Sequence, residues 1–113
     1  MGFFDFISSA ISNKQVEINE AKERAYNENL ENLFKIISGN RNVSWCKSYS
    51  QKSAVCMVIN KRLQDKNEVS DSNLEYHYNL YKKRNAFVAK MIGKELVNRG
   101  MYEEKEPGIF IRR

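Results

Sequence analysis

The side chains with the clearest chemical potential are basic residues in the last third of the chain. Lys83, Lys90 and Lys94 recur at spacings of seven and four residues, which would place them on one side of an α-helix. Arg112 and Arg113 follow near the C-terminus. Ammonium and guanidinium groups pair with phosphate oxygens, and such pairs supply much of a protein's affinity for nucleic acid. These five residues are therefore predicted to contact the phosphates of DNA or RNA.

The helix that carries these lysines would also carry an apolar stripe on its opposite side. That stripe is centred on Tyr81 and Ile92, while Tyr76 and Phe87 flank the basic side. The apolar stripe can hold such a helix to its domain while the lysines lie against a duplex groove. Lysines along one side of a helix are also typical of an ordinary solvated face, and this alternative stays open.

The distribution of charge favours an anionic partner. The net charge of the 113 residues is +5. The first 40 residues hold four basic and six acidic side chains, a net charge of −2, so the other 73 residues carry +7. A basic C-terminal part of this kind suits a polyanion or an acidic protein surface.

The end of the chain predicts a β-hairpin. The strand candidates Met101–Glu104 and Ile109–Arg112 flank Pro107-Gly108, a pair typical of a type II turn. Because type II is not the favoured turn of a two-residue hairpin, we expect a wider loop of about three to five residues. The order of helix, Gly100 and basic hairpin over roughly the last 30 residues resembles the end of winged-helix DNA-binding domains. The resemblance implies a second contact with nucleic acid through the hairpin.

The N-terminal segment offers a different function. Phe3, Phe4 and Phe6 begin the apolar stripe of a predicted helix over Gly2–Ile11. A helix lying on a membrane surface would carry Lys and Arg on its polar side, and no basic residue precedes Lys14. The three phenylalanines are therefore predicted to anchor a protein partner, which could be a second copy of the chain. In that case we expect an adaptor or inhibitor encoded by a phage or another mobile element.

Neither an active site nor a metal or cofactor site is predicted. His77 is the only histidine, Cys46 and Cys56 form no CxxC pair, and the sequence has no Gly-rich phosphate loop, GxSxG or HExxH. The N-terminal residues lack the basic region and cleavage site of a secretory signal, and no run is apolar enough for a membrane span. We therefore expect a non-enzymatic, cytoplasmic protein with reduced thiols. Cys56 is then expected in the core, with a Cys46–Cys56 disulfide as the alternative.

The helices that must position these residues are bounded by capping signals. A box of Ser12 with Gln15 predicts the start of a second helix, which runs from Asn13 to Ser38 and ends at Gly39. A box of Ser72 with Glu75 precedes the basic helix, which runs from Leu74 to Arg99 with a break near Arg84-Asn85.

A third helix is predicted from Ser50 to about Lys66, although its apolar run AVCMVI also fits a buried strand. Residues 40–49 fit a loop or a short strand. Together these elements predict a mainly α fold, with about four helices in a small bundle and a C-terminal β-hairpin. The chain is expected to be one domain, 1–113, with an amphipathic helix over 1–11, a helical core over 12–99 and a hairpin tail over 100–113.

Overall fold

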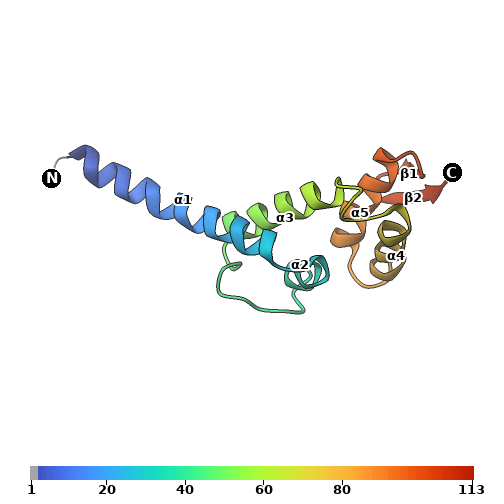
Figure 1. Ribbon diagram of the computed structural model, residues 1–113, viewed down its shortest axis with the longest axis horizontal. Helices are drawn as coiled ribbons and strands as arrows, with labels where there is room; N and C mark the ends of the chain where they lie inside the picture. The colour runs from blue at the N-terminus through green and yellow to red at the C-terminus, as the bar shows by residue number, and fades with distance from the viewer. Residues whose placement is uncertain (1–2) are drawn as a thin grey trace. The chain divides into compact units, whose positions relative to one another are not determined.

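The computed structural model describes the backbone of residues 3–113 and the side chains from Asn13 onward. Within this range the protein is mainly helical and ends in an antiparallel hairpin, which confirms the predicted fold class (Figure 1). Its elements are α1 (Phe3–Asn27), α2 (Leu30–Ile37), α3 (Tyr49–Leu63), α4 (Asp71–Tyr81), α5 (Ala86–Asn98), β1 (Tyr102–Glu106) and β2 (Ile109–Arg112). The chain forms two compact units, residues 1–58 and residues 59–113.

In the first unit, the helix break falls at a different place from the predicted one. α1 continues through Ser12, because residues 3–27 contain neither glycine nor proline to stop it. The break comes instead at Asn29, whose backbone is extended and whose side chain accepts a hydrogen bond from the Asn32 N–H at 2.8 Å. Asn29 is thus the N-cap of α2, and the predicted single helix from Asn13 to Ser38 is wrong.

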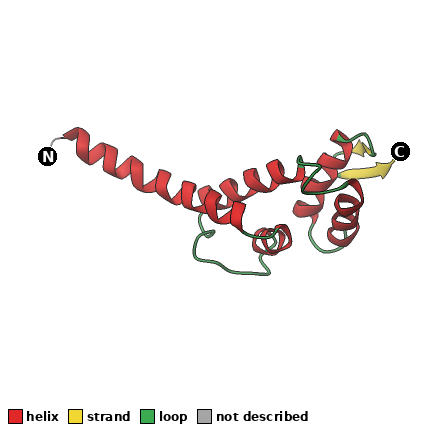
Figure 2. Cartoon of the chain, viewed as in Figure 1, coloured by secondary structure: helices red, strands yellow, loops and turns green. Residues whose placement is uncertain are grey.

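The end of α2 and the identity of α3 agree with the sequence. Gly39 has a φ of +83°, and the N–H groups of Gly39 and Asn40 bond to carbonyls of the last turn, as in a Schellman motif. Residues 40–48 form neither helix nor strand (Figure 2). α3 is a helix through AVCMVI, so the strand alternative is wrong, and it starts at a capping box of Ser48 with Gln51.

Both cysteines lie in or near the core of the first unit. Cys46 is buried and Cys56 is half-buried, and both are free thiols, so the disulfide alternative is wrong. Burial raises the pKa of each thiol, which lowers its nucleophilicity at neutral pH. The apolar core residues of this unit are Ala21, Ala25, Leu30, Leu33, Phe34, Ile36, Cys46, Ala54, Val55 and Val58.

In the second unit, α4 and α5 are separate helices with their own caps. The N-cap of α4 is Ser70, which accepts from the Asn73 N–H at 3.2 Å, so the predicted capping box of Ser72 with Glu75 is wrong. The expected break near Arg84-Asn85 is confirmed. Asn85 has an extended backbone, and its side chain accepts from the Val88 N–H at 3.0 Å to start α5.

The hairpin is tighter than the sequence suggested. β1 and β2 are joined by Pro107 and Gly108 alone, rather than by three to five residues. Gly108 has a φ of +82°, as the third position of a type II turn requires. The register shifts between Glu104 and Glu106, so Lys105 is an extra residue in β1. A bulge of this kind increases the local twist, which lets a two-residue type II turn close the hairpin.

The core of the second unit forms where α5 packs against α4 and β1. The apolar stripe predicted around Tyr81 and Ile92 is confirmed. Both residues are buried, together with Leu74, Tyr78, Val88 and Leu96. Gly100 ends α5 as predicted, with a φ of +76° and a second Schellman motif.

Candidate nucleic-acid interface

The break between α4 and α5 places three consecutive basic residues in an exposed turn. Lys82, Lys83 and Arg84 form this basic turn, and all three side chains are exposed. The predicted single helical face through Lys83, Lys90 and Lys94 does not exist, because the turn interrupts the helical periodicity after Tyr81. Lys82 and Arg84 were missed because the helix was expected to continue to Arg84, which would have turned these two side chains to other faces.

Lys90 and Lys94 share the exposed face of α5 but differ in their contacts. The Lys94 Nζ donates to Glu104 Oε1 at 2.6 Å, and Glu104 Oε2 accepts the Gly108 N–H at 2.8 Å. The hydrogen bond from Lys94 is the largest cause that lowers the pKa of Glu104, and the charge of Lys90 adds to the effect. Lys94 is therefore already paired with an anion, whereas Lys90 makes no ion pair with any side chain from residue 13 onward.

The arginines of the hairpin also have internal roles. The Arg112 guanidinium pairs with the Glu75 carboxylate on α4, and the Tyr102 hydroxyl donates to the same carboxylate at 2.7 Å. These contacts lower the pKa of Glu75, mainly through the Tyr102 hydroxyl. Arg113 is exposed, and its backbone N–H bonds to the Met101 carbonyl at 3.0 Å.

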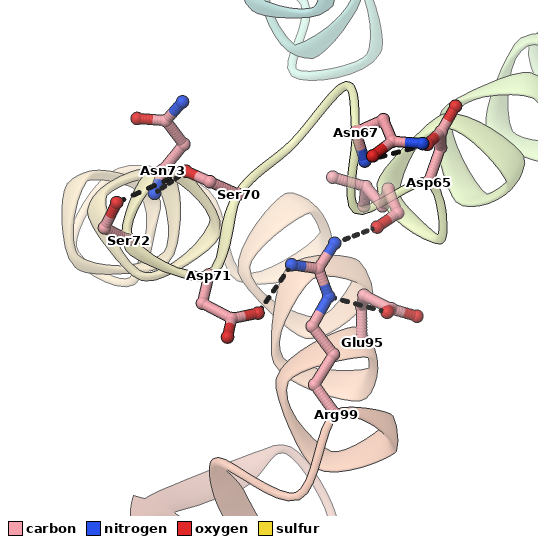
Figure 3. Close-up of polar contacts among 9 residues, drawn as sticks. Asp65, Asn67, Ser70, Asp71, Ser72, Asn73, Glu95 and Arg99 are labelled. Atoms are coloured by element: carbon pink, nitrogen blue, oxygen red, sulfur yellow. Dashed lines mark hydrogen bonds and ion pairs between the residues drawn. The ribbon is translucent and has the colours of Figure 1, made fainter.

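Arg99 is a structural anchor rather than a ligand-binding residue. Its side chain is only 2% exposed and has three acceptors (Figure 3): Asp71 at the start of α4 at 2.9 Å, Glu95 on α5 at 3.0 Å, and the Leu63 carbonyl at 2.7 Å. Because the side chain is buried and three of its five N–H donors are already bound, Arg99 is not available to an external phosphate. It joins the ends of α3 and α5 to the start of α4.

The ion pairs of the second unit involve some of its basic side chains and not others. Six of its carboxylates are in ion pairs: Glu68, Asp71, Glu75, Glu95, Glu103 and Glu104. Their partners are Arg62, Lys94, Arg99, Lys105 and Arg112. The basic turn and Lys90 take part in no ion pair among the residues with described side chains, so their charge is not compensated locally.

The remaining sequence predictions concern the N-terminal phenylalanines, His77, metal ligands and membrane spans. Phe3, Phe4 and Phe6 lie outside the residues whose side chains are described, so the predicted protein anchor stays a prediction. His77 is buried, and its ring packs edge-on against Tyr76 with 5.6 Å between centroids. In the described part of the chain, no three His, Cys, Asp or Glu side chains gather as metal ligands. None of its helices there combines the length and apolarity that a membrane crossing needs.

Comparison with family models, curated proteins and solved structures finds no match for this chain. Its function is therefore argued from its own side chains. Of the five predicted phosphate contacts, Lys83, Lys90 and Arg113 are exposed without an ion-pair partner among described side chains. Lys94 and Arg112 are bound to carboxylates. The signal that could have found the rest of the basic turn is the run Lys82-Lys83-Arg84 itself, directly before an asparagine N-cap.

Proposed function

We propose that this is a small, non-enzymatic, cytoplasmic protein with a regulatory role that binds nucleic acid through its C-terminal unit. The basic turn and Lys90 would meet backbone phosphates, with Arg113 after β2 as a further contact. The arrangement of two helices joined by a turn and followed by a hairpin supports this proposal, since it is the order in which winged-helix domains present a helix and a wing.

The uncompensated charge of the basic turn carries the proposal. Three adjacent cations repel one another, and proteins commonly offset such a cluster with nearby carboxylates. Here six carboxylates of the unit pair with other basic residues instead, and none of the described carboxylates pairs with the basic turn, which leaves it available to an external anion. A phosphate backbone supplies anions at regular spacing, so several of these side chains can be engaged at once.

A charge-reversal experiment tests this function. Lys83→Glu combined with Lys90→Glu should abolish binding of the full-length protein to fluorescently labelled DNA or RNA at low salt, as measured by anisotropy. The matched control is Lys14→Glu with Lys47→Glu, which alters the net charge equally at exposed positions of the first unit. The control should bind nearly as the wild type does. Absence of wild-type binding at low salt, or equal losses in both variants, would refute the proposal.

A further inference from the structure

A groove in the second unit combines an exposed aromatic ring with cations and amides. It lies between the end of α3 and the face of α5 and has a volume of about 440 Å³. Phe87 and Met91 provide apolar lining, and Lys90 lies between them in sequence. Phe87 is 55% exposed, so its ring is open to a ligand in the groove.

The amide side chains of the lining can both donate and accept hydrogen bonds. Asn60, Gln64 and Asn98 line the groove, and each amide offers a donor and an acceptor. The one carboxylate of the lining, Glu95, is already bound by Arg99, so it does not repel an anion as a bare carboxylate would. Lys94 also lines the groove but is held by Glu104, which leaves Lys90 as the cation for an external phosphate.

We propose that this groove holds one unstacked nucleotide of a single-stranded nucleic acid, with its base against Phe87 and its phosphate on Lys90. Single strands are bound by aromatic rings that stack on bases, next to cations that follow the backbone. Amides are suited to the donor and acceptor edges of an unpaired base. In a duplex the faces of the bases are covered by their neighbours, so Phe87 would have nothing to stack on.

This inference rests on the proposed function and adds that the bound nucleic acid is single-stranded rather than a duplex. The basic turn alone would bind phosphates of duplexes and single strands with similar effect, because it has no aromatic side chain. The groove is recessed between two helices and therefore favours a flexible strand that can turn a base inward. The protein is thus expected to prefer a single strand over a duplex of the same length.

The test compares a labelled oligothymidylate with a duplex of equal length, by anisotropy at low salt with the full-length protein. The wild type should bind the oligothymidylate more tightly. Phe87→Ala should weaken this binding at least about fivefold, which is the lower end of the loss for one stacking ring, while duplex binding changes less than about twofold. Phe87→Tyr should bind like the wild type, because a tyrosine ring also stacks.

The matched control is Tyr76→Ala, which removes an equally exposed aromatic ring, 59% exposed, from α4 outside the groove. It should leave both affinities unchanged, and circular dichroism should show that both alanine variants fold.

Equal or tighter binding of the duplex, or the same effect of Phe87→Ala and Tyr76→Ala, would overturn the inference while leaving the proposed function intact. Displacement of the strand by free thymidine monophosphate would also overturn it, because the groove would then be a pocket for a free nucleotide. Failure to bind either nucleic acid would instead refute the proposed function.

Discussion

Gly93 on α5 and Phe110 on β2 approach so closely that a Cβ atom on Gly93 would lie 2.6 Å from two carbons of the phenylalanine ring. The ring cannot move aside easily, because it is buried and packs edge-on against Tyr78 with 6.0 Å between centroids. This contact sets how closely the hairpin lies against α5, and so where the β-turn lies relative to the exposed face of that helix.

Gly93→Ala should therefore destabilise the protein although alanine is the better helix former. Overpacking of a core costs about 1–3 kcal/mol, whereas the gain in helix propensity is about 1 kcal/mol. With contacts as close as 2.6 Å, the overpacking cost should lie in the upper part of its range, so a net loss of about 1–2 kcal/mol should appear in urea unfolding followed by circular dichroism. Phe110→Leu should lower the free energy of unfolding less in the Gly93→Ala variant than in the wild type, because the smaller leucine side chain makes room for the alanine methyl group. An unchanged or higher free energy of unfolding for Gly93→Ala would contradict the packing described here.

Arg99 should be among the residues most sensitive to substitution. Arg99→Ala leaves the buried Glu95 carboxylate without its cation and removes the guanidinium that donates to the Leu63 carbonyl. Loss of one partner of a buried ion pair costs about 3–5 kcal/mol. Asp71→Asn should cost less than about 1 kcal/mol, because the Asp71 side chain is 58% exposed. Urea unfolding of both variants gives the comparison. Similar losses for the two would mean that burial of the guanidinium contributes little.

The contact of Glu75 with Tyr102 and Arg112 should make stability depend on pH. Its pKa is lowered from the ordinary value of 4.5, so the ionised carboxylate stabilises the fold above that pH. This stabilisation should be lost as the pH falls from about 4.5 through the lower pKa of the folded state. Glu75→Gln should flatten part of the acid decline in melting temperature. Glu106→Gln is the control, since Glu106 forms no ion pair with the described side chains, and its profile should follow that of the wild type.

The apolar pattern predicted the second unit's core well because helical periodicity is local. Leu74 and Tyr78 are one turn apart on α4, and Val88 and Ile92 are one turn apart on α5, so each helix shows its inward face whether or not the two are joined. The positions of Gly39 and Gly100 were likewise local signals, because few other residues adopt a positive φ at a helix end.

The partners of the charged residues could not be predicted, because they depend on the tertiary fold. Glu75 and Tyr102 are 27 residues apart, and Arg99 and Asp71 are 28 apart, so no helical or strand spacing relates them. A lone sequence gives the type and number of charges but not which carboxylate meets which cation. For this reason Lys94 could not be distinguished from Lys90 before its contact with Glu104 was seen.

Lys90 and Lys94 lie on the same face of α5 but only Lys94 is bound to a carboxylate, so the two should contribute differently to nucleic-acid binding. Lys90→Gln removes an uncompensated charge, so the plot of log affinity against log salt should flatten by about 0.7 for a single strand or about 0.9 for duplex DNA. Lys94→Gln should flatten it less, because the Lys94 ammonium is already hydrogen-bonded to Glu104 and adds little net positive potential to the surface. Anisotropy titrations at several salt concentrations measure both slopes on the same labelled strand. Equal changes in slope would mean that bound nucleic acid draws Lys94 away from Glu104, and that the ion pair seen here is exchanged on binding.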